Sequence, residues 1–188
     1  MATIFTVGHG TRTTDELSEV LRSAAVGRLV DVRRFPGSRR HPQFKREALE
    51  ASMPAHGIAY EWWGEALGGR RSRPKGAPSR HPAWRDPAFQ GYADYMDTPP
   101  FREALTKLED AAREPPLLAV MCAETLWWRC HRRLIADALE VDGWEVVHLL
   151  SPTSRERHKL HEALRLDAHG RPVYDQVDGM APLFEDPS

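Results

Sequence analysis

The sequence predicts an α/β protein in which a mostly parallel, five-stranded sheet carries helices on both faces. Five short apolar runs with strand character alternate with segments of helical spacing, which is the pattern of parallel sheets joined by crossover helices. The chain has 188 residues, about the length of one domain. Its composition of 41% hydrophobic and 28% charged residues is typical of a globular protein and argues against disorder.

The first three elements predict a βαβ unit. Residues 3–7 are short and β-branched, and they run into a glycine-flanked loop that contains His9, as at the end of a buried strand. A hydroxyl or Asp cap within residues 13–15 precedes apolar residues that share one helical face, which predicts a helix. Residues 28–33 predict the second strand and bring Asp31 close to its end. The crossover rule makes the two strands parallel.

The middle of the chain combines helices with a long irregular segment. We expect helices over residues 45–56, 89–96 and 101–113, and a short third strand over residues 58–63. Residues 64–88 are rich in proline, glycine and basic side chains and predict a loop. A loop of this length inside a compact domain is often a lid or a binding loop.

A near-continuous apolar run over residues 116–121 predicts a central strand that is buried on both faces. Residues 127–139 have helical spacing, and residues 144–150 predict the fifth strand. We therefore expect one α/β domain over residues 1–150, followed by a polar C-terminal extension over residues 151–188.

Ligands of open α/β sheets bind at the carboxyl ends of the strands, so the residues there are the first candidates for function. Cys122 and Glu124 follow the expected central strand directly. Cys122 is a candidate nucleophile or metal ligand, and Glu124 is a candidate general acid or base. The alternatives are a small core residue for Cys122 and, for Glu124, a structural ion pair with Arg33 or Arg132.

Cys130, His131 and Arg132 lie near the expected start of the next helix. The free N–H groups there suit an anion and lower the pKa of a thiol. Cys122, Cys130 and His131 do not have the paired short spacing of a zinc finger, so a metal site would need ligands assembled in space. As an alternative, these three residues predict that the protein binds haem or iron, with Cys or His as an axial ligand.

Two basic segments contain no acidic residue. Residues 33–46 hold six Lys or Arg residues and residues 70–85 hold another six, out of 26 in the chain. Guanidinium groups bind phosphates in pairs of hydrogen bonds, and Phe35 and Phe44 could stack on bases. The net charge of -1 excludes a polycationic protein that coats nucleic acid. The alternative for both segments is a solvated basic loop.

These observations give three sets of candidate residues. The residues expected in catalysis are Cys122, Glu124, His9 and Asp31. The residues expected to bind an anion are Arg33, Arg39, Arg129 and Arg132. The residues expected to stack on a planar ligand, with core packing as the alternative, are Trp62, Trp127 and Trp128.

Several motifs together resemble the domain-of-unknown-function 488 family. The matching motifs include Gly8-His9, Asp31-Val32-Arg33, Ser38-Arg39, Leu67-Gly68-Gly69, Met121-Cys122-Ala123-Glu124 and Cys130-His131-Arg132. The resemblance extends over roughly residues 3–150. It implies a three-layer, Rossmann-like α/β fold and a bacterial or archaeal cytoplasmic protein, and it implies no particular activity.

We expect an enzyme that acts by hydrolysis or transfer on a phosphate-bearing ligand, such as a nucleotide or a nucleic-acid end. The alternatives are a non-catalytic module that binds nucleic acid or a nucleotide, and a haem or iron redox protein that uses Cys122, Cys130 or His131. The chain has two cysteines, no signal-like start and no apolar run as long as a membrane span. We therefore expect a cytoplasmic protein without a disulfide scaffold or a membrane partner.

Overall fold

The computed structural model describes residues 2–37, 39–72 and 76–176, and these residues contain a six-stranded sheet with the order β3-β2-β4-β1-β5-β6. The five parallel strands are β1 (Thr3–Gly8), β2 (Val26–Asp31), β3 (Ala59–Trp62), β4 (Leu117–Cys122) and β5 (Glu145–Ser151). The sixth strand, β6 (Ser154–Arg157), is antiparallel to β5. The predicted α/β class with a mostly parallel sheet is confirmed.

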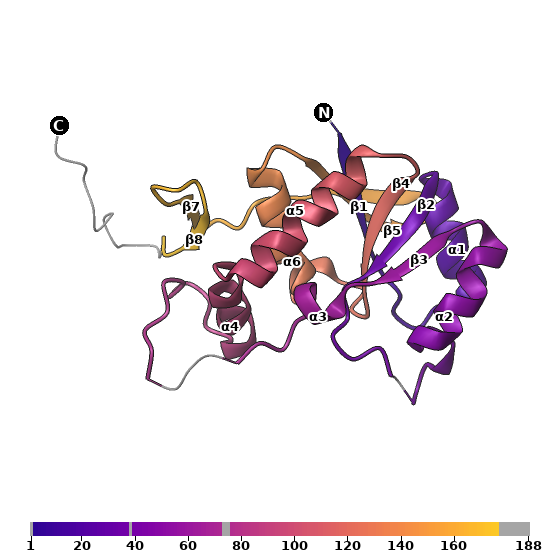
Figure 1. Ribbon diagram of the computed structural model, residues 1–188, viewed down its shortest axis with the longest axis horizontal. Coiled ribbons are helices and arrows are strands. Elements are labelled where there is room, and N and C mark those ends of the chain that lie inside the picture. Colours follow the sequence, from indigo (N-terminus) through magenta and orange to yellow (C-terminus); the bar gives the residue numbers. More distant parts are fainter. Residues whose placement is uncertain (1, 38, 73–75, 177–188) are drawn as a thin grey trace.

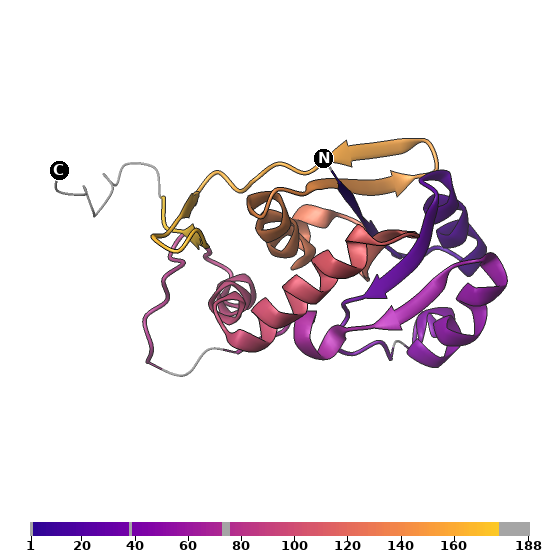
Figure 2. The same cartoon turned by 45° about the horizontal axis from the view of Figure 1, so that its top comes forward.

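Helices cover both faces of the sheet and form a three-layer, Rossmann-like fold (Figures 1 and 2). One face packs against α1 (Thr14–Ser23) and α2 (Arg46–Ser52). The other face packs against α4 (Pro87–Met96), α5 (Pro99–Arg113) and α6 (Arg132–Val141). Within the described residues, no helix is long and apolar enough to cross a membrane.

The central strand β4 shows how the sequence produces the layers. Leu118 and Val120 are buried in the core under α4, α5 and α6, whereas Ala119 and Met121 are buried in the core under α1 and α2. Successive side chains of a strand point to opposite faces, so a continuous apolar run fills both cores. The prediction of a strand buried on both faces is confirmed.

Thr13, one of the possible capping residues in the sequence, is the N-cap of helix α1. The Thr13 hydroxyl accepts a hydrogen bond from the Glu16 backbone N–H at 3.1 Å, and the Glu16 carboxylate accepts one from the Thr13 N–H at 2.7 Å. This reciprocal capping box satisfies two N–H groups that the helix itself leaves unpaired. The helix then buries Leu17, Val20 and Leu21 on one face.

The expected helix over residues 127–139 begins later, at Arg132. Trp127 instead starts a short 3-10 helix (Trp127–Arg129), and Cys130 has extended backbone angles. Trp127 is buried, stacks on His148 with ring centroids 4.3 Å apart, and donates from Nε1 to Glu156 at 3.1 Å. These contacts place residues 127–129 against β5 and β6, and α6 begins only after this segment.

The expected five strands become six because residues 154–157 pair with β5. The Ser-Arg-Glu-Arg sequence of β6 is polar and carries no apolar alternation, so it gave no strand signal. Farther along, β7 (Leu164–Leu166) and β8 (Pro172–Tyr174) form a hairpin. Tyr174 is buried against the core under α4, α5 and α6, and its hydroxyl donates to Asp137 Oδ2 at 2.9 Å. Part of the expected polar extension is therefore packed onto the core.

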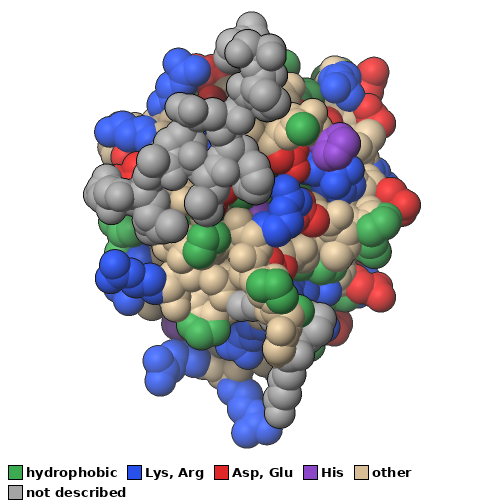
Figure 3. Space-filling model, turned by 90° about the vertical axis from the view of Figure 1, so that its left-hand side faces the viewer, with side chains coloured by type: hydrophobic (Ala, Val, Ile, Leu, Met, Phe, Trp, Pro, Cys, Tyr) green, Lys and Arg blue, Asp and Glu red, His purple; other side chains and the backbone are tan. Residues whose placement is uncertain are grey.

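The expected loop over residues 64–88 begins with a short helix, α3 (Gly64–Leu67), and its last two residues belong to α4. Its Ala83 N–H donates to the Tyr174 carbonyl at 3.0 Å, which ties the loop to the hairpin. On the face in Figure 3, side chains of both charge signs are interspersed, and hydrophobic side chains lie in separate spots. The part of this face that the described residues form therefore shows no broad apolar patch.

Candidate functional site

A cavity of about 410 Å³ lies at the carboxyl ends of β2 and β4, next to the start of α6. The segment after β2 contributes Arg33, Arg34 and Phe35 to its lining, and the segment after β4 contributes Cys122 and Glu124. The cavity therefore lies at the edge of the sheet where we expected the functional residues to be.

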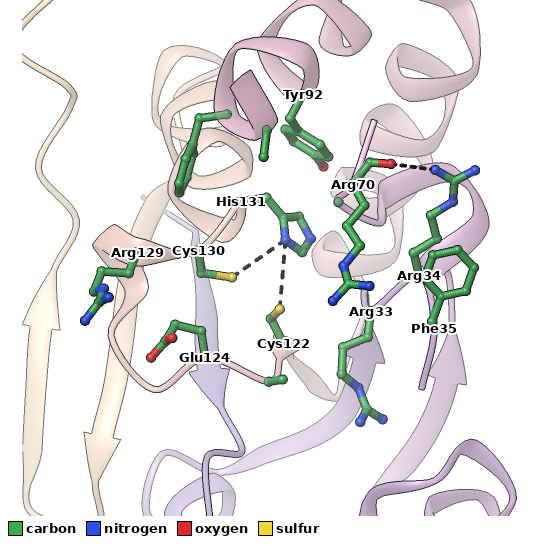
Figure 4. A pocket seen from close by; sticks show the side chains of 14 residues that line it. Arg33, Arg34, Phe35, Arg70, Tyr92, Cys122, Glu124, Arg129, Cys130 and His131 are labelled. Atoms are coloured by element: carbon green, nitrogen blue, oxygen red, sulfur yellow. Dashed lines mark hydrogen bonds between the residues drawn. The ribbon is translucent and has the colours of Figure 1, made fainter. Parts of the chain in front are cut away.

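Three chemically reactive side chains converge in the cavity (Figure 4). The His131 Nδ1 atom lies 3.9 Å from the Cys122 Sγ atom and 3.7 Å from the Cys130 Sγ atom. All three atoms lie within 4.8 Å of one another. Cys122 is the last residue of β4, while Cys130 and His131 directly precede α6. The fold thus assembles a cluster that the eight-residue separation of the cysteines did not reveal.

The two thiols have different surroundings. Burial raises the pKa of Cys130, but the neighbouring Cys122 thiol and the positive charge of Arg132 outweigh burial and lower this pKa below its ordinary value. The Arg132 backbone N–H also points at the Cys130 Sγ atom, at 3.5 Å. The hydrogen bond to Cys130, together with burial, raises the pKa of Cys122 above its ordinary value. Arg132 therefore favours the charged form of Cys130, whereas burial favours the neutral thiol of Cys122.

The Arg33 guanidinium is held by a buried network. Its Nε atom donates to Asp31 Oδ1 at 2.9 Å, and its Nη2 atom donates to Asp31 Oδ2 at 2.6 Å. The Arg33 backbone N–H and the Tyr60 hydroxyl also donate to the same carboxylate. Burial lowers the pKa of Arg33, but the hydrogen bonds and charge of Asp31 outweigh it and raise the pKa. Arg33 is thus a fixed cation at the edge of the cavity.

His9 completes this network. Its Nε2 atom lies 3.1 Å from Arg33 Nη1, and its Nδ1 atom lies 2.9 Å from the Gly10 carbonyl. Arginine only donates, so Nε2 accepts and Nδ1 carries the proton. Burial, followed by the charge of Arg33, lowers the pKa of His9 to about 4, so the ring is neutral at pH 7. Its ring stacks on Phe44, with centroids 4.1 Å apart.

His9 and Asp31 were expected to be catalytic, but neither lines the cavity. Both Asp31 oxygens already accept two hydrogen bonds each, so the carboxylate has no free acceptor for a substrate proton. The structure places both residues behind Arg33, where they fix its guanidinium.

Glu124 lines the cavity and is exposed. Its Oε1 atom accepts a hydrogen bond from the Leu126 N–H at 3.2 Å. Among the described residues it forms no ion pair, so the expected alternative of a structural pair with Arg33 or Arg132 does not occur there. Arg132 is buried and donates from Nη2 to the Glu124 carbonyl oxygen at 2.5 Å. It therefore shapes this loop from inside and does not line the cavity.

The remaining expected residues are divided. Arg129 is exposed and lines the cavity, whereas Arg39 is exposed but does not line it. The tryptophans expected to stack on a ligand do not line it either. Trp62 donates from Nε1 to the Arg33 carbonyl at 2.8 Å, Trp127 lies in the core, and Trp128 is 43% exposed.

Aromatic side chains from other segments take the place of the tryptophans. Phe35, Phe89 and Tyr92 line the cavity, and the Tyr92 ring lies 5.0 Å from the His131 ring. Arg70 also lines it, and its carbonyl accepts a hydrogen bond from the Arg34 guanidinium at 2.8 Å. Arg34 and Arg70 belong to the two basic segments of the sequence, residues 33–46 and 70–85. No local sequence pattern showed that these segments meet at the cavity.

Comparison with known proteins adds one finding. A search of curated proteins and a search of solved structures give no match. A family model matches residues 13–139, which is more than half of the chain and includes the cavity residues that follow β2 and β4. The chain therefore belongs to the family described as Domain of unknown function DUF488.

Proposed function

We propose that the protein is an enzyme that acts on a small phosphate-bearing ligand, such as a nucleotide, by hydrolysis or transfer. One observation carries the proposal: the cluster of Cys122, Cys130 and His131 opens into a cavity whose lining also contains several arginines. Reactive side chains and anion-binding side chains face the same space, which is what a site for chemistry on an anion requires.

The charges of the lining favour an anionic ligand. Arg33, Arg34, Arg70 and Arg129 line the cavity, and Glu124 is its one acidic residue among those that the structure describes. An arginine-rich concave site attracts anions and binds phosphate oxygens through paired hydrogen bonds. Arg33 is preorganised by Asp31, so it can hold a phosphate without losing side-chain freedom.

An exposed aromatic ring favours a nucleotide among phosphate-bearing ligands. Phe35 lines the cavity and is 67% exposed, and the Arg34 guanidinium lies 5.4 Å from its ring centroid. A base could stack on this ring while the arginines hold the phosphates.

We assign proton transfer to Glu124. It is the acidic group in the lining, and its hydrogen bond to the Leu126 N–H orients the carboxylate. General acid–base catalysis requires a titratable group within reach of the reacting atoms, and Glu124 meets that condition better than the enclosed Asp31. His9 and Asp31 act as positioning residues for Arg33.

The experiment measures binding and turnover separately. Wild-type protein is incubated with nucleoside mono-, di- and triphosphates, and released phosphate and free base are quantified. Glu124→Gln should abolish turnover while the dissociation constant of the bound nucleotide changes little. Glu103→Gln, an exposed carboxylate on α5, is the matched control and should behave as wild type. Turnover that persists in Glu124→Gln would refute the assignment.

Binding of nucleic acid without catalysis is the second candidate, because Arg39 and Arg40 are exposed outside the cavity. A fluorescent single-stranded oligonucleotide would then bind with a steep salt dependence, and Arg39→Gln would reduce the slope by about one phosphate contact. The cavity enzyme makes a different prediction. There, Arg129→Gln weakens nucleotide binding and Arg39→Gln does not.

A further inference from the structure

The cluster of Cys122, Cys130 and His131 offers three metal-ligating atoms that point toward one another. Two sulfur atoms and one imidazole nitrogen lie within 4.8 Å. Both cysteines are buried, and they come from two segments that the sheet and α6 hold in place. Two Cys and one His form a donor set that Zn²⁺ uses in enzymes.

The separations suit a single tetrahedral ion. With Zn–S bonds of about 2.3 Å and Zn–N bonds of about 2.0–2.1 Å, tetrahedral angles put donor atoms about 3.6–3.8 Å apart. The two distances from His131 Nδ1 are 3.9 and 3.7 Å, so they exceed the separation of about 3.6 Å expected for sulfur and nitrogen by only a few tenths of an ångström. Only the separation of the two Sγ atoms, within 4.8 Å, leaves room to close by small side-chain rotations.

The surroundings hold these donors in place. A Cβ atom on Gly69 would lie 3.0 Å from His131 Nδ1, so the backbone there packs closely against the imidazole ring. The Arg132 backbone N–H points at the Cys130 Sγ atom from the start of α6. Such N–H···S contacts orient a thiolate ligand and offset its negative charge.

The arrangement argues against haem. A haem iron takes axial ligands on a line perpendicular to a flat macrocycle, whereas these three donors converge on one point from neighbouring positions. The residues thus suit a single ion.

We infer that Cys122, Cys130 and His131 bind Zn²⁺ as a three-ligand site whose fourth position opens onto the arginine-lined cavity. All three residues line that cavity, so a ligand in it can reach the ion. Three protein ligands with an open position are typical of catalytic zinc, which polarises a phosphoryl oxygen or activates a water molecule. The use of this ion in turnover rests on the proposed function, whereas its binding does not.

The test uses the full chain, reduced and stripped of metals with a chelator. Titration with Co²⁺ under anaerobic conditions should give one equivalent of a tetrahedral species, with intense visible bands and thiolate charge-transfer bands. Zn²⁺ should displace the Co²⁺ and remove these bands. Because removing a positioning group already costs 10–100-fold in metal affinity, Cys122→Ser and His131→Gln should weaken Zn²⁺ binding by about 100-fold or more.

The controls keep the result decisive. His169→Gln changes an exposed histidine outside the cluster and should bind Zn²⁺ as wild type. If the buried Cys122→Ser variant fails to fold, the half-buried His131→Gln variant carries the test. Cobalt binding without thiolate bands would overturn the inference, as would unchanged Zn²⁺ affinity in His131→Gln.

A separate measurement distinguishes this inference from the proposed function. Binding of pyrophosphate is measured with metal-free and Zn²⁺-loaded protein. Zn²⁺ binding without pyrophosphate binding would leave the metal site standing and refute the anion site. Pyrophosphate binding by a protein that fails to bind Zn²⁺ would refute the metal site alone.

Discussion

Replacing Asp31 with asparagine should destabilise the protein strongly, because it leaves a buried cation without its partner. Asp31 is 0% exposed and Arg33 is 7% exposed. Removing one partner of a buried, hydrogen-bonded ion pair costs about 3–5 kcal/mol in the free energy of unfolding. We expect Asp31→Asn to lose stability in this range.

The hydrogen bonds of Asp31 give a similar magnitude. The carboxylate accepts four hydrogen bonds, from the N–H, Nε and Nη2 of Arg33 and from the Tyr60 hydroxyl. An asparagine keeps one oxygen and turns an NH₂ group toward the other donors, so two of these bonds are lost. At about 1.5–3 kcal/mol for each bond to a charged group, the loss is about 3–6 kcal/mol.

Urea denaturation at pH 7, followed by tryptophan fluorescence, measures the effect. The control is Glu50→Gln, which removes the charge of the exposed Arg46–Glu50 ion pair. The N···O distance in this pair is 2.7 Å, close to the 2.6 Å of the Arg33–Asp31 pair. Exposed pairs at this spacing on a helix contribute about 0.3–0.5 kcal/mol, so the control should barely change the midpoint. A loss below about 1 kcal/mol in Asp31→Asn would show that Arg33 is satisfied without Asp31, against the expectation for a buried pair.

Three further predictions concern single positions. The pKa of His9 is about 4 in the folded protein and 6.5 in the unfolded chain, so the unfolded chain takes up the proton first as the pH falls. His9 should therefore lower the free energy of unfolding by about 3 kcal/mol between pH 6.5 and pH 4. Urea denaturation at both pH values should show a smaller fall for His9→Gln than for the wild type. Gly69→Ala should leave the fold intact but weaken Co²⁺ binding at least about 10-fold, because the new methyl group presses on His131; circular dichroism and Co²⁺ titration check this. Gly8→Ala puts a Cβ atom 2.0 Å from a loop carbonyl and should lower the free energy of unfolding by about 1–3 kcal/mol or more, measured by thermal unfolding. Gly37→Ala is the control, because its Cβ atom meets none of the described atoms within 4 Å, and it should be nearly neutral.

Most of the fold could be predicted because each parallel strand is a short apolar run in the sequence. The alternation of apolar runs and helical spacing identified all five parallel strands, β1 to β5, to within a few residues. β6 was not predictable in the same way, because its residues are polar and pair only with the exposed edge of β5. Edge strands bury little apolar surface, so their sequences carry little periodicity.

The segments that form the candidate site were predictable from the sequence, but the contacts of its side chains were not. The rule for strand ends selected Cys122 and Glu124, and the expected start of a helix selected Cys130 and His131. Sequence could not show that the Arg33 side chain consumes the hydrogen-bonding capacity of Asp31, because that depends on rotamers and on burial.

The arginines of the cavity divide into two kinds, and this division bears on how a chain with a net charge of -1 would attract the anionic ligand proposed above. The charge of Arg33 is compensated by Asp31, so this residue contributes a fixed pair of donors more than a positive field. Arg34, Arg70 and Arg129 are partly or fully exposed, so their charges reach the solvent and can attract a ligand. A bound Zn²⁺ ion and its two thiolate ligands would together carry no net charge. The exposed arginines would therefore guide the ligand, while Arg33 and the metal would set its position.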